Sequence, residues 1–170
     1  MTDPAHQWPH QDTAALNAFY GDPRGNNGMA NPQWEAENLV HWVPPYEMYY
    51  SGNPGVPMSH LLVHKKCLDT FNAAFKEVLD TLGMDYIKAN RLNITGGTNC
   101  YRLERGGSNL SVHSWGCAID MDPQHNPFPH VWDMKMISLK FAGILQKHGF
   151  TWRGAGGDID PMHFQLCYRK

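Results

Sequence analysis

Glycine and proline interrupt this chain so often that they leave room for few long regular elements. The 170 residues include 16 Gly and 12 Pro, and both residue types break helices and strands from within. The interruptions are dense over residues 21–32 and 44–57, which predicts an irregular N-terminal arm over residues 1–60. Hydrophobic residues still make up 42% of the chain, enough for a globular core. We therefore expect a single globular unit with short elements and many loops.

Aromatic side chains are unusually frequent in the irregular arm. They lie at Trp34, Trp42, Tyr46, Tyr49 and Tyr50. Aromatic residues bury large apolar areas. We therefore expect the arm to pack on a domain formed by residues 61–170. Its role, as a wall of a substrate groove or as packing alone, stays open.

Two segments have the periodicity of amphipathic helices. Apolar residues at three- and four-residue spacing predict a helix over residues 65–82, ended by Gly83. A second helix is predicted over residues 133–148, with Asp133 as its cap and Gly149 after its end. Short apolar or alternating segments predict strands within residues 92–95, 116–122, 150–153 and 162–168, and residues 61–63 form a short apolar run. Because strands and helices do not alternate strictly, we predict an α+β fold with a central antiparallel sheet and flanking helices.

The charge balance and the absence of long apolar segments argue against several functional classes. The chain has 14 Lys+Arg and 16 Asp+Glu, a net charge of -2 with the 10 His neutral. This balance does not suit a protein that binds nucleic-acid phosphates or an anionic membrane surface. No stretch of about 18 apolar residues predicts a membrane span, and the first residues lack the pattern of a secretory signal. We expect a protein made in a cytoplasm, with no nucleic-acid partner and no membrane insertion.

The four cysteines do not predict a metal site of their own. They lie at Cys67, Cys100, Cys117 and Cys167, and no C-x-x-C pair occurs. We expect buried free thiols, while a disulfide formed after export stays open.

Two segments carry the candidate chemistry, residues 111–120 and residues 158–165. His113, Asp120 and His163 offer two imidazoles and one carboxylate. Catalytic zinc commonly has three protein ligands of these kinds and one open position. We expect His113 before a strand, Asp120 on that strand and His163 on another strand. The three side chains could then converge across a sheet.

Asp160 lies three residues before His163, in a position that suits a general base beside a metal site. The remaining histidines fit surface or helix-end positions better than ligand positions; they are His6, His10, His41, His60, His64, His125, His130 and His148. The His/Asp/His set suits zinc best and also accepts other divalent ions.

The two segments together resemble a known family. The first reads S-x-H-x-x-G-x-A-x-D and the second D-x-x-H. This combination resembles the LAS-type zinc peptidases, which comprise D-alanyl-D-alanine carboxypeptidases, dipeptidases and L-alanyl-D-glutamate endopeptidases and share a fold with the zinc domain of hedgehog proteins. The resemblance covers roughly residues 60–168 and is closest to small bacterial and phage cell-wall peptidases, many of them endolysins. The fixed positions of the first pattern are Ser111, His113, Gly116, Ala118 and Asp120.

The resemblance implies roles for the metal site and the base. One zinc ion per chain would be bound by His113, Asp120 and His163. Asp160 would take a proton from the attacking water and pass it to the leaving amine. The chain departs from many relatives at Gln165, where they have Glu, so the contact behind a ligand differs.

The resemblance also implies substrate contacts around the metal. An arginine upstream of the first pattern would stabilise the oxyanion or bind a substrate carboxylate, and Arg102 is the best match, with Arg105 as the alternative. Ser111 would line the substrate pocket. Trp152 would pack near the His163 strand and contribute to substrate binding.

The function that the resemblance implies is hydrolysis of an amide bond in the stem peptide of peptidoglycan. Our leading interpretation is a phage-type endolysin with L-Ala–D-Glu endopeptidase activity, made as a monomer in the host cytoplasm and released to the cell wall by a holin. A D-Ala–D-Ala carboxypeptidase would use the same residues. A non-catalytic zinc-binding module is less favoured because Asp160 is present. A virion-associated wall-opening protein is less favoured by the single-domain size.

Overall fold

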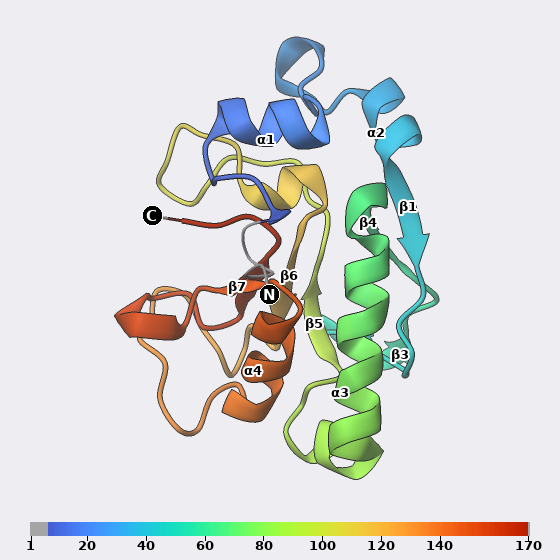
Figure 1. The fold of residues 1–170 in the computed structure, drawn as a ribbon, viewed down its shortest axis with the longest axis vertical. Coiled ribbons are helices and arrows are strands. Elements are labelled where there is room, and N and C mark those ends of the chain that lie inside the picture. The colour runs from blue at the N-terminus through green and yellow to red at the C-terminus, as the bar shows by residue number, and fades with distance from the viewer. Residues whose placement is uncertain (1–6, 170) are drawn as a thin grey trace.

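A six-stranded sheet lies at the centre of the fold, and two longer helices pack against it (Figure 1). The structure is a computed structural model and describes residues 7–169. Its helices are α1 (Thr13–Tyr20), α2 (Pro32–Asn38), α3 (Leu68–Ala89) and α4 (Leu139–Lys147), with 3-10 turns η2 (Asn26–Gly28), η3 (Lys65–Cys67), η4 (Val112–Trp115) and η5 (Ala155–Gly157). Its strands are β1 (Leu39–Trp42), β2 (Tyr49–Tyr50), β3 (Asn53–Pro57), β4 (Leu61–His64), β5 (Ile94–Gly97), β6 (Ala118–Met121), β7 (Thr151–Trp152) and β8 (His163–Gln165).

The central sheet has the order β3-β2-β5-β6-β8-β7. Neighbouring strands are antiparallel except for β2 and β5, which run parallel. β1 and β4 form a separate antiparallel pair. The predicted α+β class with a largely antiparallel central sheet is confirmed. Each strand predicted from the sequence is present; β6, β7 and β8 are shorter than predicted, and β5 is shifted by two residues. The apolar run at residues 61–63 lies in β4.

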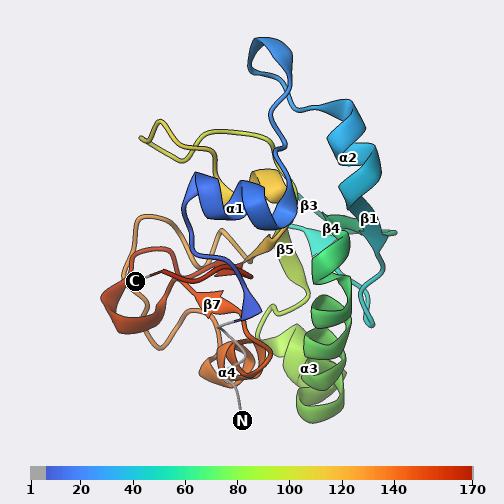
Figure 2. The ribbon, with the colours of Figure 1, turned by 45° about the horizontal axis from the view of Figure 1, so that its top comes forward.

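Helices α3 and α4 lie side by side against the sheet (Figures 1 and 2). Aromatic rings form the contact between the layers. Phe75 of α3 meets Phe141 of α4 with ring centroids 5.9 Å apart, and Phe141 meets Phe164 of β8 at 5.6 Å. All three side chains are fully buried. This layer fixes β8, which carries one of the candidate ligands.

The first predicted helix is present with a break at the expected glycine. α3 begins at Leu68, and residues 65–67 form the short turn η3 instead. At Gly83 the backbone adopts φ 73° and ψ 160°, a conformation that glycine reaches without steric cost. Helical turns then resume as far as Ala89. Gly83 therefore ends the predicted segment but not the helical region.

The second predicted helix is wrong over its first part. α4 begins at Leu139, not at Asp133. The Asp133 carboxylate accepts a hydrogen bond from the backbone N–H of Lys135 at 2.7 Å, which closes a local turn rather than capping a helix. Gly149 follows the helix with φ 91°, consistent with the predicted C-terminal end.

The N-terminal arm is more regular than the sequence suggested. Residues 7–60 contain α1, α2 and three strands. β1 pairs with β4, and β2 pairs with β5, so two of the arm strands pair with strands formed by later residues. The arm's buried side chains join the same hydrophobic cluster as α3, α4 and β8; they are Trp8, Leu16, Tyr20, Trp34, Trp42, Tyr46 and Met48.

Hydrogen bonds also join the beginning of the described chain to the segment that follows β8. The N–H of Gln11 donates to the carbonyl of Tyr168 at 2.8 Å, and the N–H of Tyr168 donates to the carbonyl of Pro9 at 3.0 Å. The buried hydroxyl of Tyr20 donates to the carbonyl of Leu166 at 2.6 Å. The arm thus pairs with the segment that directly follows β8, the strand that carries His163.

We expect the arm's packing to contribute strongly to stability, and Trp42 provides the test. Its ring lies 4.9 Å from that of Phe71 and 4.7 Å from that of Phe75, and it is fully buried. Trp42→Ala should lower the free energy of unfolding by about 3–5 kcal/mol, measured by denaturant titration. Val43→Ala is the control, because Val43 is 66% exposed and its loss should cost less than about 0.5 kcal/mol. Equal effects of the two substitutions would contradict this account.

The described cysteines are free. Cys67, Cys117 and Cys167 are buried as expected, whereas Cys100 is exposed. Burial raises the pKa of the Cys67 thiol to about 12, so this thiol stays protonated and unreactive at neutral pH.

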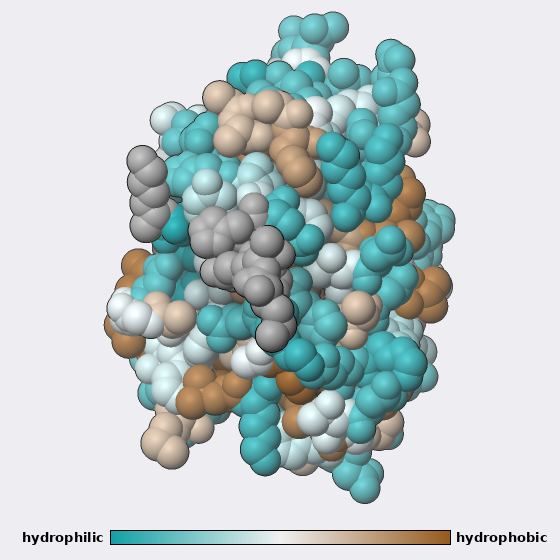
Figure 3. All heavy atoms as spheres, viewed as in Figure 1, coloured by the Kyte–Doolittle hydropathy of each residue, from teal (hydrophilic) through white to brown (hydrophobic). Residues whose placement is uncertain are grey.

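The surface is mainly hydrophilic in the view of Figure 3, with small separate hydrophobic patches. Among the described residues, no helix combines the length and the apolar character that crossing a membrane requires.

Candidate metal centre

A tight turn places His113 beside the sheet. His113 lies on η4, and Gly116 follows at its C-terminal end with φ 66°. A Cβ at Gly116 would lie 2.8 Å from the Leu39 side chain and 3.0 Å from the backbone nitrogen of His64. Only glycine therefore allows both this left-handed backbone and this close approach. The chain turns there directly into β6.

Strand pairing places Asp120 opposite His163. The two are direct partners in the antiparallel β6–β8 ladder, so their side chains project from the same face of the sheet. The neighbouring strand β5 leaves room for them at Gly96, where a Cβ would lie 2.7 Å from Pro123 Cγ and 3.2 Å from Asp120 Cβ. Asp120 and His163 therefore lie on neighbouring strands of one sheet, as expected from the sequence.

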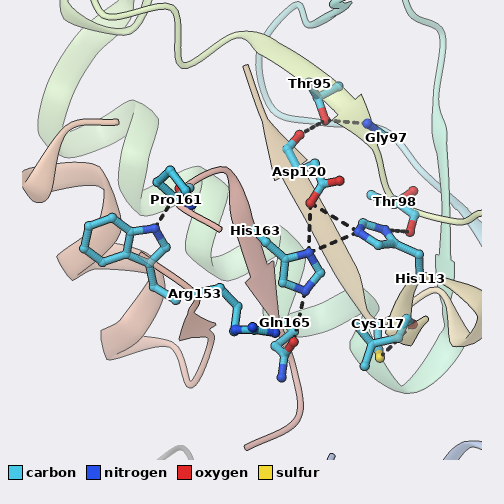
Figure 4. Close-up of polar contacts among 12 residues, drawn as sticks. Thr95, Gly97, Thr98, His113, Cys117, Asp120, Arg153, Pro161, His163 and Gln165 are labelled. Carbon is cyan, nitrogen blue, oxygen red and sulfur yellow. Dashed lines mark hydrogen bonds and ion pairs between the residues drawn. The ribbon is translucent and has the colours of Figure 1, made fainter. Parts of the chain in front are cut away.

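The three candidate ligand atoms form a small triangle (Figure 4). His163 Nδ1 lies 2.8 Å from Asp120 Oδ1 and 3.1 Å from His113 Nε2. His113 Nε2 lies 3.2 Å from the same Asp120 oxygen. Ligand atoms of a tetrahedral zinc site, with bonds of about 2.0–2.1 Å, are about 3.3 Å apart. The triangle is therefore close to the size that zinc requires and slightly smaller.

Hydrogen bonds behind the triangle orient both imidazoles. His113 Nδ1 lies 2.8 Å from the carbonyl oxygen of Thr98. A carbonyl only accepts, so Nδ1 carries the proton and Nε2 has the free lone pair. His163 Nε2 lies 3.0 Å from Gln165 Oε1. The Gln165 amide nitrogen donates to Gln11 Oε1 at 2.8 Å and to the Cys167 carbonyl at 3.1 Å, which leaves its oxygen facing His163.

In its neutral form each imidazole consequently directs a lone pair at the Asp120 carboxylate. Three acceptor atoms then face one another within 2.8–3.2 Å. A proton can join one pair of these atoms, whereas a divalent cation satisfies all three. The residues present therefore fit a zinc ion held by His113, Asp120 and His163. A metal ion needs several ligand atoms close together. Among residues 7–169, these three side chains each offer one such atom, and the three atoms lie within 4.8 Å of one another.

The electrostatics of the triangle keep Asp120 ionised. Burial opposes the charge, but His113 and His163 outweigh burial and hold the pKa of Asp120 well below its usual range. Burial likewise opposes a charge on His113, and the nearby Asp120 raises the pKa of His113 above its ordinary value. A carboxylate that is ionised inside a buried polar site is the charge that a metal ligand set needs.

Asp160 lies at the same site with an uncommitted oxygen. Its Oδ1 is buried and has no hydrogen-bond partner within residues 7–169. Burial, with the negative charge of Asp120, raises the pKa of Asp160 against the opposing effect of His163. An unpaired buried carboxylate oxygen is costly unless a ligand or water engages it. The Asp160 carboxylate can therefore accept a proton beside the candidate metal site.

A cavity of about 180 Å³ opens over the triangle and includes Asp160 in its lining. Of the other expected residues, Arg102, Arg105 and Ser111 line it. Arg102 Nη1 donates to the carbonyl of Leu103 at 3.1 Å, and the Arg105 guanidinium lies 5.4 Å from the centroid of the Phe128 ring. Both arginines are thus within reach of a group bound in the cavity.

Trp152 has a packing position in the fold. Its ring stacks on Phe164 with centroids 6.0 Å apart, and its Nε1 donates to the carbonyl of Pro161 at 2.8 Å. The side chain is buried, and the residues that line the cavity do not include it. The structure therefore places Trp152 in the packing beside β8, and its contribution to substrate binding stays a prediction.

Several residues of the site escaped sequence reasoning. Thr98 contributes only a backbone carbonyl, which leaves no signal in the sequence. Gln11 comes from the arm, 154 residues before its partner Gln165. Arg153 and Arg169 also line the cavity. The glycine-rich turn at residues 154–157 was the sequence signal that could have predicted a contact between Arg153 and Asp158.

The Gln165 contact predicts an effect on metal affinity. Gln165→Leu removes the acceptor that fixes the Nε2–H of His163, so zinc affinity should fall by about 10–100-fold. Competition with a chromophoric chelator measures it. Gln165→Glu retains an acceptor at this position and should stay much closer to the parent protein. Unchanged affinity in Gln165→Leu would show that Gln165 does not orient the ligand.

Comparison with known proteins found a family match within the second half of the chain. The family model described as D-alanyl-D-alanine carboxypeptidase matches residues 105–166. This match confirms the resemblance expected from the motifs over these 62 of the 170 residues. The matched range includes the three residues of the triangle and Asp160, and it excludes Arg102. Comparisons with curated proteins and with solved structures found no match.

Proposed function

We propose, from the family match over residues 105–166, that the protein is a zinc metallopeptidase that hydrolyses an amide bond in the stem peptide of peptidoglycan. Within that class we propose an L-Ala–D-Glu endopeptidase acting as a phage-type endolysin. Such a protein would work as a monomer at the cell wall after holin-type release from the host cytoplasm.

One observation carries the proposal. Three lone pairs converge from His113, Asp120 and His163, and the uncommitted Oδ1 of Asp160 lies in the same cavity. A structural metal site usually closes all four positions with protein ligands. Here three ligands leave one position free, and a candidate base stands beside it. This combination favours a peptidase over a non-catalytic zinc-binding module.

The chain's own residues would divide the chemistry between them. Zinc bound at this site would polarise the amide carbonyl and lower the pKa of water. Asp160 would take the proton from the attacking water and deliver it to the amine that leaves. Arg102 would donate to the oxyanion or to a substrate carboxylate, and Ser111 would line the pocket beside it.

The test is digestion of purified sacculi followed by mass spectrometry. An endopeptidase releases stem peptides that begin at D-Glu. Loss of lytic activity on treatment with a chelator, and its return with zinc, would support the metal dependence. Zinc binding without any product would favour a binding module and would overturn the proposed activity.

A D-Ala–D-Ala carboxypeptidase is the second candidate. The description of the matched family favours it, and both reactions would use the same four residues of the site. The same digestion separates them, because a carboxypeptidase releases free D-Ala and leaves the rest of the stem intact. Detection of the protein in purified phage particles would instead favour a virion-associated role.

A further inference from the structure

Two arginines and one aspartate form a cluster at the edge of the cavity, outside the metal site. Arg153 Nε and Nη2 donate to the two carboxylate oxygens of Asp158 at 2.5 and 3.2 Å. Arg169 Nη1 donates to Asp158 Oδ2 at 3.0 Å. One carboxylate thus holds two guanidinium groups. The cluster keeps a net positive charge of one.

The local sequence explains how the cluster forms. Arg153 ends the strand region of β7, and the turn through Gly156 and Gly157, with φ 63° and 84°, brings Asp158 back beside it. Arg169 arrives from the segment that follows β8. Hydrogen bonds from Arg153 and from the N–H of Ile159 hold the pKa of Asp158 below its ordinary value, although partial burial opposes them. Asp158 is therefore a fixed anion that orients both arginines.

Arg153 and Arg169 line the cavity, whereas Asp158 does not. Both guanidinium groups also have N–H donors that Asp158 does not use. A guanidinium has five N–H groups, and the bonds to Asp158 use two of those on Arg153 and one on Arg169. The Arg153 side chain is 17% exposed and that of Arg169 is 47% exposed. A single arginine would neutralise Asp158, so the second one leaves the cluster with a net positive charge at the edge of the cavity.

This cationic edge lies on the Asp160 side of the site. The N–H of Asp160 donates to the carbonyl of Arg153 at 3.2 Å, and the N–H of Arg153 donates to the carbonyl of His163 at 2.9 Å. Arg153 is among the charges that act on Asp160, whereas Arg102 acts on His113. Figure 4 accordingly shows Arg153 beside His163, away from His113. The cavity therefore has cationic groups on the Asp160 side in addition to Arg102 and Arg105.

We propose that Arg153 and Arg169, oriented by Asp158, form a second anion-binding subsite that binds the free carboxylate of the residue on the amine side of the scissile bond. A guanidinium pair matches a planar carboxylate in shape and charge. Because Asp160 delivers a proton to the leaving amine, a subsite next to Asp160 is on the leaving-group side. This inference rests on the proposed peptidase function and adds a specificity determinant to it.

The test compares two synthetic peptides that differ in one group. Each contains the L-Ala–D-Glu bond of the proposed function. One has a free carboxylate on the amine-side residue, and the other has the carboxamide. The parent protein should prefer the carboxylate peptide in kcat/KM by about 10–100-fold, the usual range for a charge-assisted contact. Arg169→Gln and Arg153→Gln should each reduce that preference toward equality. Arg24→Gln is the matched control, since this arginine pairs with Asp22 on the surface, and it should keep the full preference.

Equilibrium binding separates this inference from the proposed function. The affinities of both peptides are measured with zinc-loaded Asp160→Asn protein by calorimetry, with and without the arginine substitutions. A carboxylate preference in binding that the arginine substitutions remove, without hydrolysis by the parent protein, would support the subsite and overturn the peptidase. No preference in the parent protein, or a preference that survives both substitutions, would overturn the subsite while hydrolysis still supports the peptidase. Arg169→Gln keeps the test decisive if Arg153→Gln does not fold, because Arg169 is the more exposed of the two.

Discussion

His113→Ala should bind no stoichiometric zinc and should lose its hydrolytic activity by about a thousandfold or more. His113 supplies one of three converging lone pairs, and its loss leaves Asp120 and His163 as a two-ligand site. Elemental analysis after dialysis measures the metal, and peptide release from sacculi measures the activity. His125→Ala is the control, because His125 is exposed and pairs with Asp122 away from the cavity; it should retain both.

Buried His113 also contributes to packing, so the parent protein treated with a chelator provides an independent measurement. It should lose activity to the same extent with its fold intact by circular dichroism, and zinc should restore it. Full activity in either metal-free sample would exclude the metal-dependent mechanism.

Asp160→Asn should retain zinc and lose about 10²–10⁴-fold in kcat. The amide keeps the size of the carboxylate but cannot accept a proton from water. Asp160 is not one of the three converging groups, so the metal content should stay near one zinc per chain. Stopped or continuous peptide assays at saturating substrate give kcat, and elemental analysis of the same samples gives the metal.

Asp80→Asn is the matched control for this substitution, because Asp80 pairs with Lys76 on the surface of α3 and should leave kcat unchanged. If Asp160→Asn instead loses zinc, Asp160 is a ligand. If it keeps both zinc and turnover, another group is the base.

The sequence predicted the parts of the site that depend on short-range pattern. The sequence around His113, Asp120 and His163 predicted a loop, a strand and a second strand, and the structure brings these three residues together. Strand pairing explains this success, because cross-strand partners in an antiparallel ladder project to the same face. Asp160 was placed near the site by its distance of three residues from His163.

Contacts made through the tertiary fold could not be predicted. Gln11 reaches Gln165 from the other end of the chain, and no local pattern encodes that meeting. The stacking of Trp152 on Phe164, which buries the Trp152 ring, is likewise a contact that the sequence does not specify. The same limit applies to the helix expected over residues 133–148. Its apolar periodicity is real over α4, while the turn at Asp133 uses a side-chain hydrogen bond that competes with helix formation.

The pairing of the N-terminal segment with the last strand region limits how this fold can be used as a module. A boundary at residue 60 follows the change in composition, yet a fragment that starts there would lack Gln11 and the Tyr20 hydroxyl. It would expose the strand that carries His163 and free the Gln165 amide to rotate. Domain exchange between enzymes of this kind should therefore move the arm and the metal site together, with the junction placed before the arm rather than after it.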